Sequence, residues 1–286
     1  MAAQDEVHTW AFIGLGNMGG PMALNLHRRL PASDEMLVYD TDISAAEMVV
    51  EEASAEEVCT SLLVHKGSPR PGRLIIDCST IDPVTSRRIH RILESTGFGT
   101  FVDAPMSGGV VGARAATLSF MVGGTEDTFR RVQPILNRMG RNVVHCGKHG
   151  TGLSAKLANN YLLAINNLAT AEAMNFGVKA GLDPLILARI INSATGRNWA
   201  SEVNNPVPGV DKAAPASRQY QGGFASALMN KDLKLAITAA EQVRAPLLLS
   251  QAASDIYGKL EGDKRYAGLD FSAVYDYLQG NEKAKL

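Results

Sequence analysis

Three glycines near the start of the chain have the spacing of a phosphate-binding turn. They lie in "WAFIGLGNMGGPMALNL", between an apolar run and a helical run. The motif, G-x-G-x-x-G, consists of Gly14, Leu15, Gly16, Asn17, Met18 and Gly19. The first glycine permits a tight turn, the second lets a pyrophosphate approach the backbone, and the third lets the helix pack against the strand. Amides at the helix N-terminus would then bind the phosphates.

An acidic residue follows at the distance expected of a ribose-binding group. Asp40 ends the next predicted strand, 21 residues after Gly19. A carboxylate at this position binds the adenosine ribose hydroxyls and would repel a 2′-phosphate. The pair of signals predicts NAD, in preference to NADP, as the cofactor. The alternative is a glycine-rich turn followed by a solvated aspartate.

The elements that must position these residues change in character along the chain. Strand-like runs alternate with helical runs such as 21–30 and 83–95 as far as Gly150, which predicts a parallel sheet with helices on both faces. The predicted strands are 9–14, 35–40, 73–79, 100–106, 118–124 and 142–147.

After Gly152 the pattern is helical. Residues 153–180 contain no proline and predict one helix about 40 Å long. Further helices are predicted at 183–194, 228–243 and 246–260, with an ordered loop at 204–223. We therefore predict an α/β fold with two domains. Residues 1–150 form a Rossmann-type doubly wound sheet that binds NAD, and residues 151–286 form an all-α substrate and dimerisation domain that begins with the long helix.

Composition excludes several classes of partner. The net charge of −1 gives no basic surface for nucleic acid, and no apolar stretch is long enough to span a membrane. The three cysteines are few and far apart, so neither a disulfide framework nor a metal site is predicted. A small-molecule substrate is the expected partner.

Four further stretches resemble, in order, the signatures of the β-hydroxyacid dehydrogenase family. They are "DCSTIDPVTSR" (77–87), "DAPMSGGVVGARAATLSFMVGG" (103–124), "GTGLSAKLANN" (150–160) and "LMNKDLKLA" (228–236). The stretches "AEAMNFGVKAGLDP", "NPVPGV" and "YQGGF" are closer still to one member, whose substrate is 3-hydroxyisobutyrate, an intermediate of valine catabolism. The resemblance implies oxidation of a β-hydroxy acid, with a hydride passed to the nicotinamide.

The resemblance also implies the catalytic side chains. Lys156 matches the family's catalytic lysine, which accepts the hydroxyl proton and returns it in the reverse direction. Asn160 lies four residues later on the same helix face, where it would orient the substrate. A lysine that accepts a proton at neutral pH needs a lowered pKa, which burial would supply. The alternative is a surface lysine on an amphipathic helix.

Other matching positions are expected to bind substrate and cofactor. Ser107, Gly108 and Gly109 match the substrate-binding serine and glycines, whose consecutive amides could converge on a carboxylate. Thr80 and Lys231 match positions that contact the cofactor. Asp232, beside that lysine, is interpreted as a residue that positions its helix, and Trp199 as a wall of the substrate pocket or a core residue.

One interval departs from the family. Residues 41–72 are too few for the two strands and helices expected there, because one βαβ unit alone needs about 30 residues. We find one helical run, 43–58, and one candidate strand, "SLLVH", and about thirty residues are missing. Either "SLLVH" replaces the lost strand, or the sheet has a gap, or the chain is a damaged variant or an incorrect gene model.

The sequence leaves the substrate, the catalytic activity and the cellular location open. The substrate could instead be tartronate semialdehyde, or the chain could be a non-catalytic relative that serves only as an oligomerisation partner; a homodimer or homotetramer is expected in the catalytic case. The family resemblance implies a mitochondrial location. No presequence is recognised, and Ala284-Lys285-Leu286 approximates a peroxisomal signal.

Overall fold

The computed structural model describes residues 8–39 and 72–283, with only the backbone for 35–39 and 281–283. The chain divides into two compact units, Met1–Lys156 and Leu157–Leu286. We call them the N-terminal unit and the C-terminal unit. The division falls six residues after Gly150, inside the long helix.

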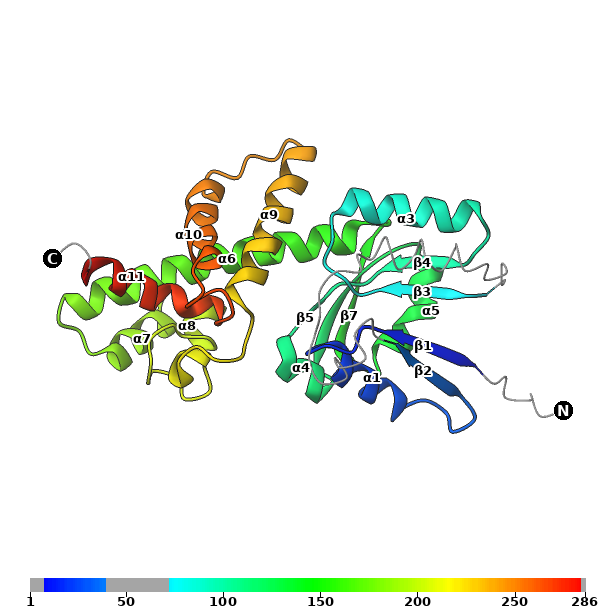
Figure 1. Ribbon diagram of the computed structural model, residues 1–286, viewed down its shortest axis with the longest axis horizontal. Coiled ribbons are helices and arrows are strands. Elements are labelled where there is room, and N and C mark those ends of the chain that lie inside the picture. The colour runs from blue at the N-terminus through cyan, green and yellow to red at the C-terminus, as the bar shows by residue number, and fades with distance from the viewer. Residues whose placement is uncertain (1–7, 40–71, 284–286) are drawn as a thin grey trace. The chain divides into compact units, whose positions relative to one another are not determined.

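The N-terminal unit opens with two parallel strands joined by a helix (Figure 1). These elements are β1 (Thr9–Ile13), α1 (Gly19–His27) and β2 (Glu35–Tyr39). The strands pair in register along their whole length. The glycine motif therefore stands between a strand and a helix, which is the local structure that its sequence predicts.

A second, five-stranded sheet forms the rest of the unit. Its elements are β3 (Leu74–Asp77), α3 (Pro83–Ser95), β4 (Thr100–Asp103), β5 (Met106–Ser107), α4 (Gly109–Ala115), β6 (Leu118–Gly123), α5 (Glu126–Leu136) and β7 (Gly140–Gly147). The strand order is β3-β4-β6-β5, and β7 also pairs with β6. The pairs β3–β4 and β6–β7 are parallel. The strands of the first pair are connected by α3 and those of the second by α5. The predicted Rossmann-type fold is confirmed at this level.

The prediction of a parallel sheet is wrong at the centre of this sheet. β6 runs antiparallel to both β4 and β5. Only residues 108–117 connect β5 to β6, and a parallel crossover needs a dozen residues or more. The predicted strand 100–106 is also two strands, because Pro105 has no amide hydrogen to donate to a ladder.

Local signals in the sequence determine where α3 begins and what it covers. The Asp82 side chain accepts a hydrogen bond from the Thr85 amide at 2.8 Å, and Pro83 occupies the first helical position. Ile89 and Leu93 on its buried face share a hydrophobic cluster with Phe101 of β4. The ribbon shows α3 lying over β4 (Figure 1). The prediction of a helix at 83–95 is confirmed residue for residue.

The two sheets share one core but no backbone pairing within the described residues. Among the described strands, β1 pairs with β2 and β3 pairs with β4, and no ladder joins β1 to β3. Trp10 and Phe12 of β1 nevertheless pack into the cluster that holds Val102 and Val122 of the larger sheet. The candidate strand "SLLVH" and almost all of the short interval, residues 41–71, lie outside the described residues.

The C-terminal unit is mainly helical in its described part, as predicted, with a long loop between α8 and α9. Its elements are α6 (Thr151–Lys179), which begins in the N-terminal unit, α7 (Pro184–Ser193), α8 (Trp199–Glu202), the 3-10 turn η1 (Pro215–Arg218), α9 (Ser226–Gln242), α10 (Ser250–Gly262), the turn η2 (Phe271–Ala273) and α11 (Val274–Lys283). The helix predicted at 246–260 begins later, at Ser250.

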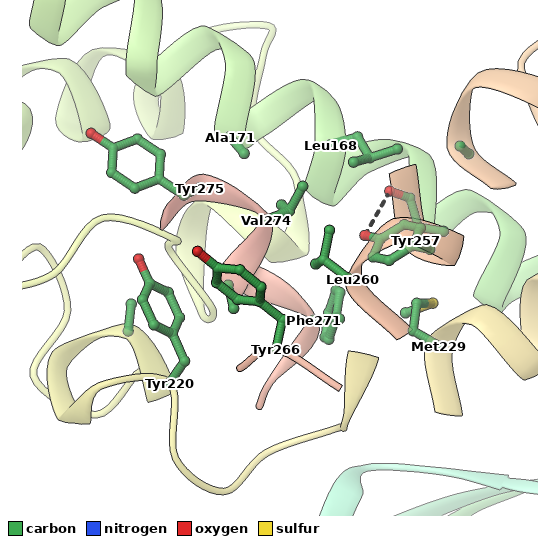
Figure 2. Close-up of a cluster of buried hydrophobic side chains, with 14 of the residues drawn as sticks. Leu168, Ala171, Tyr220, Met229, Tyr257, Leu260, Tyr266, Phe271, Val274 and Tyr275 are labelled. Carbon is green, nitrogen blue, oxygen red and sulfur yellow. Dashed lines mark hydrogen bonds between the residues drawn. The ribbon is translucent and has the colours of Figure 1, made fainter. Parts of the chain in front are cut away.

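The core of this unit gathers around α6 (Figure 2). Leu168 and Ala171 of α6 meet side chains from α9 and α10, among them Met229 and Tyr257. The Tyr257 hydroxyl donates to the Ala164 carbonyl at 3.4 Å and accepts from the Asn167 amide at 2.9 Å. The middle of α6 is thereby fixed within this unit.

The described residues contain neither a candidate membrane span nor a candidate metal cluster. No described helix combines the length and the apolar character needed to cross a bilayer. Within 8–39 and 72–283, no three His, Cys, Asp or Glu side chains gather where they could hold a metal ion.

Candidate active site

The glycine turn has the backbone geometry that its motif requires. Gly14 adopts a φ of +87°, which side-chain-bearing residues rarely adopt. A Cβ on Gly19 would collide with the Gly14 carbonyl oxygen, so only glycine lets α1 start this close to the turn. Met18 stands at the N-cap of α1, and its side chain accepts no hydrogen bond from the helix. The turn fits a bound pyrophosphate, for which bare backbone and a helix N-terminus are needed.

The remaining residues predicted to bind the cofactor are spread along the chain. Leu15 and Gly16 are partly buried in the turn, and Asn17 is exposed. Thr80 lies in the loop that follows β3 and is partly buried. Asp40, the predicted ribose-binding residue, lies outside the described residues.

Lys156 is buried and bonded to the predicted substrate-binding serine. It lies in the second turn of α6, and only 8% of its surface is exposed. Its Nζ donates a hydrogen bond to Ser107 Oγ at 3.0 Å. The alternative of a solvated surface lysine is therefore wrong. The structure joins two residues that are 49 positions apart in the chain.

The two glycines after Ser107 form an unusual backbone turn. Gly108 has a φ of +134° and Gly109 a φ of +62°, so both need glycine for conformational reasons. A Cβ on Gly108 would lie 3.0 Å from Leu118 Cδ2, whereas one on Gly109 would meet no atom within 4 Å. Successive amides in such a turn can converge on an anion.

Asn160 and Lys231 are linked through Asp232 in the C-terminal unit. Asn160 Nδ2 donates to Asp232 Oδ2 at 2.7 Å, and both residues are almost fully buried. Asn159 Nδ2 donates to Asn160 Oδ1 at 3.1 Å, which fixes the other end of the amide. Lys231 Nζ lies 3.3 Å from Asp232 Oδ1, with half of its side chain exposed.

Sequence reasoning missed this role of Asp232. We interpreted it as a residue that positions its own helix, α9, but its carboxylate binds the predicted substrate-orienting amide on α6. The spacing Lys156–Asn160 could not reveal it, because Asp232 is 72 residues away from Asn160. Trp199, at the start of α8, keeps 49% of its surface exposed and is not a core residue of this chain.

A second buried carboxylate, that of Asp103, was also missed. Asp103 ends β4, and its oxygens accept the amides of Gly150 at 2.8 Å and Leu153 at 3.1 Å. Burial raises the pKa of the Asp103 carboxyl, and these two hydrogen bonds oppose the rise. The stretch "DAPMSGG" carries this aspartate four residues before Ser107, but nothing in it shows that the carboxylate binds amides about 50 residues away.

The structure provides a buried amine, a hydroxyl and a buried amide, each with a hydrogen-bond partner. In the N-terminal unit the structure brings Lys156 to Ser107, beside the Gly108–Gly109 turn. In the C-terminal unit it brings Asn160 to Asp232 and Lys231. A buried amine hydrogen-bonded to a hydroxyl is suited to exchange a proton with a bound alcohol.

Comparison with protein families assigns both halves of the chain to dehydrogenase domains. Residues 150–278 match the family described as the NAD-binding domain of NADP-dependent 3-hydroxyisobutyrate dehydrogenase. Residues 9–68 and 45–147 match the NAD-binding domain of 6-phosphogluconate dehydrogenase in two overlapping pieces.

Individual relatives are similar along nearly the whole chain. The mitochondrial 3-hydroxyisobutyrate dehydrogenase of Mus musculus is 44% identical over 296 aligned positions, which cover 95% of this chain and 87% of that protein. The 3-hydroxyisobutyrate dehydrogenase of Pseudomonas aeruginosa is 42% identical and covers 95% and 99%. The structure of the Mycobacterium tuberculosis enzyme, described with L-serine, superposes with a TM-score of 0.84 at 40% identity and covers 96% and 100%.

These similarities extend through both units and include every stretch on which the resemblance was based. The chain is thus an oxidoreductase by descent, with the dinucleotide-binding fold of its relatives. It belongs to the β-hydroxyacid dehydrogenase family, within the group of 3-hydroxyisobutyrate dehydrogenases.

Proposed function

We propose that this chain oxidises 3-hydroxyisobutyrate to methylmalonate semialdehyde with NAD, as a step of valine catabolism. The observation that carries the proposal is the buried Lys156 amine held 3.0 Å from Ser107 Oγ, in a chain similar to 3-hydroxyisobutyrate dehydrogenases over 95% of its length. A surface lysine would give no such support.

In the proposed reaction, Lys156 takes the proton of the substrate hydroxyl on its neutral amine. NAD, when bound, supplies the acceptor for the hydride that leaves the same carbon. The alcohol thereby loses one proton and one hydride and becomes an aldehyde. In the reverse direction the protonated amine returns the proton to the carbonyl oxygen. The forward reaction needs the amine in its neutral form.

Ser107, Gly108, Gly109 and Asn160 would hold the substrate. The Ser107 hydroxyl and the amides of the glycine turn are donors suited to a carboxylate. Asn160 is fixed by Asp232 and Asn159, so its remaining hydrogen-bonding capacity has one orientation. L-serine, named with the Mycobacterium tuberculosis structure, is itself a small β-hydroxy acid, which supports this substrate class.

The residues present fit a dinucleotide. Gly14 to Gly19 would hold the pyrophosphate, with Thr80 and Lys231 as further contacts. We propose NAD and not NADP because Asp40 would repel a 2′-phosphate. The preference for NAD over NADP needs an experiment, because the family matched by residues 150–278 is described as NADP-dependent.

The test is a titration of the purified chain with NAD and NADP, followed by an assay with 3-hydroxyisobutyrate. We expect NAD to bind more tightly and to support turnover. Asp40→Ala should bring the two affinities closer together, and an unchanged ratio would show that the ribose is held elsewhere. Tartronate semialdehyde, assayed in the reductive direction with NADH, is the competing substrate; faster turnover with it would replace the proposed substrate.

A second candidate, a non-catalytic relative, is favoured by the short interval at 41–72. The alignment with the mouse protein spans 296 positions, more than the 286 residues of this chain, so the mouse protein has residues that this chain lacks. In addition, two parts of one family model both match residues 45–68. A chain that binds neither NAD nor NADP in the titration, yet self-associates, would establish this candidate.

Self-association is part of both candidates. Exposed apolar side chains on α7, Leu185, Ile186 and Ile190, offer a surface for a second copy of the chain. Sedimentation should show a dimer or tetramer, and a monomer at micromolar concentration would contradict this.

The compartment is a separate proposal. Relatives named as mitochondrial support a mitochondrial location, and Ala284-Lys285-Leu286, outside the described residues, favours a peroxisomal one. A fluorescent tag placed at each end in turn distinguishes the two, because each tag masks only one terminal signal.

A further inference from the structure

We propose that Asp103 is the positioning residue for Lys156: it fixes the first turn of α6 and thereby keeps the amine against Ser107. The inference deepens the proposed function, because it concerns the residue proposed to carry the proton. Asp103 itself need not touch the substrate or the cofactor.

The first observation is that both oxygens of the carboxylate are used on the helix backbone. Oδ1 accepts from the Gly150 amide at 2.8 Å and Oδ2 from the Leu153 amide at 3.1 Å. Asp103 has no exposed surface. A buried carboxylate that accepts two amides at the positive end of a helix holds that helix end strongly.

The second observation is that neighbouring glycines make room for this carboxylate. A Cβ on Gly123 would lie 2.5 Å from both oxygens of Asp103. A Cβ on Gly152 would lie 2.9 Å from Oδ2 and would also collide with the Met121 carbonyl. The space that holds the Asp103 carboxylate is therefore available only because Gly123 and Gly152 have no side chains.

The third observation is that Asp103 and Ser107 belong to one short segment and hold α6 at two points. The segment is fixed on the sheet, where the Ala104 amide donates to the Asp77 carbonyl at 2.7 Å and the Met121 amide donates to the Pro105 carbonyl at 2.9 Å. Asp103 accepts a hydrogen bond from the backbone of the first helical turn, and Ser107 Oγ accepts one from Lys156 Nζ at 3.0 Å.

The consequence follows from the spacing on the helix. Leu153 and Lys156 are three residues apart, about one turn, so they lie on neighbouring parts of one face. A shift of the first turn would move the amine relative to Ser107 and to any substrate held there. A misplacement of 1 Å at a reacting group can cost about a hundredfold in rate.

The experiment uses Asp103→Asn in the full chain. An asparagine keeps one acceptor oxygen but turns an NH₂ group toward the second helix amide, so one hydrogen bond is lost. We expect kcat to fall about 10- to 100-fold, while the Kd for NAD stays unchanged. We also expect faster acetylation of Lys156 in a short pulse of acetic anhydride, read by mass spectrometry against the exposed Lys179.

The matched control is Asp183→Asn. Asp183 Oδ1 likewise accepts two amides, those of Leu185 and Ile186, at the start of α7. Its loss should lower stability but leave kcat and the labelling of Lys156 unchanged. Equal effects of the two variants would overturn the proposal in favour of general helix capping.

A double variant tests whether Asp103 acts through Lys156. In the Lys156→Ala background, Asp103→Asn should have no further effect on kcat, because its target is gone. The same fractional loss in both backgrounds would overturn the proposal. If Asp103→Asn does not fold, Gly123→Ala displaces the carboxylate without removing it, and the same outcomes are expected. Failure of both variants to fold would assign Asp103 to stability alone.

The labelling result keeps this inference separate from the proposed function. If the unmodified chain shows no turnover, the proposed function fails, and the acetylation rates still decide whether Asp103 holds Lys156 in place. Unchanged acetylation in folded Asp103→Asn would overturn the inference even if the chain is active.

Discussion

Two buried side chains one turn apart on α6 are held by different units. Lys156 bonds to Ser107 in the N-terminal unit at 3.0 Å, and Asn160 bonds to Asp232 in the C-terminal unit at 2.7 Å. Each unit also provides one buried aspartate that accepts hydrogen bonds from this helix or the residue just before it. Asp103 binds backbone amides, whereas Asp232 binds a side-chain amide.

The two units hold different parts of α6. The N-terminal unit fixes the helix itself and then the amine that it carries. The C-terminal unit holds the middle of α6 through the Ala164 carbonyl and orients the Asn160 amide, which is uncharged. Damage to the first contact should therefore act on proton transfer, and damage to the second on the orientation of the substrate. Four predictions test this division.

The largest effect is expected from Lys156→Ala. Loss of a proton-transfer group should lower kcat by about 10²–10⁴, with the Kd for NAD unchanged. Steady-state kinetics and a cofactor titration measure the two quantities. Lys179→Ala, in the last turn of the same helix, is the matched control and should behave as the unmodified chain. An active Lys156→Ala would remove the lysine from the mechanism.

The second prediction concerns the glycine turn of the N-terminal unit. In Gly19→Ala the new Cβ meets the Gly14 carbonyl, so the turn or α1 must move. We expect the affinity for NAD to fall about tenfold or more, which corresponds to at least about 1.4 kcal/mol. Gly258→Ala is the control, since a Cβ there meets no atom within 4 Å. Equal NAD affinities in the two variants would exclude this turn as the pyrophosphate site.

The third prediction separates the two bonds of Asp232. Asp232→Ala leaves the buried Asn160 amide without its acceptor, which costs about 1–3 kcal/mol, and should lower kcat/KM about tenfold. Asp232→Asn keeps an acceptor for Asn160 and loses only the ion pair with half-exposed Lys231, which contributes little. The kcat/KM of Asp232→Asn should therefore stay within about threefold of that of the unmodified chain. If the two variants lose the same activity, the ion pair and not the amide bond is what matters.

The smallest effect is expected from His149, just before α6. Burial and the stacked His90 ring, 3.5 Å away between centroids, lower the pKa of His149 to about 4. Its ordinary value is 6.5. As the pH falls from about 6.5 to 4, the unfolded chain takes up the proton first, so the free energy of unfolding decreases over this window.

His149→Phe should remove that acid-dependent loss in the N-terminal unit. The measurement is the urea midpoint at pH 5 compared with pH 7.5, with exposed His27→Gln as the control. A pH dependence in His149→Phe equal to that of the unmodified chain would show that another group is responsible.

Much of the fold could be predicted because its signals are local. Asp82 and Pro83 mark the start of α3, and the glycine motif marks a strand, a turn and a helix. The antiparallel course of β6 could not be predicted, because it depends on which strand a ten-residue connection can reach. The helices α4 and α5 were not anticipated either, although Thr125 caps α5 by accepting from the Thr128 amide.

The site divides in the same way. The resemblance pointed to Lys156 and Ser107, and the structure brings them within hydrogen-bonding distance. The roles of Asp103 and Asp232 were invisible in the sequence, since each depends on partners 47 to 72 residues away. No local pattern distinguishes such an aspartate from a solvated one.

The division into two units has a practical consequence for spectroscopy. The chain has only two tryptophans, and Trp10 belongs to the N-terminal unit while Trp199 belongs to the C-terminal unit. The Trp10 indole donates to Asp34 at 2.9 Å, whereas Trp199 is half-exposed, so their emission maxima should differ. Replacing one indole with phenylalanine therefore leaves a fluorescent reporter for the melting of a single half of the protein.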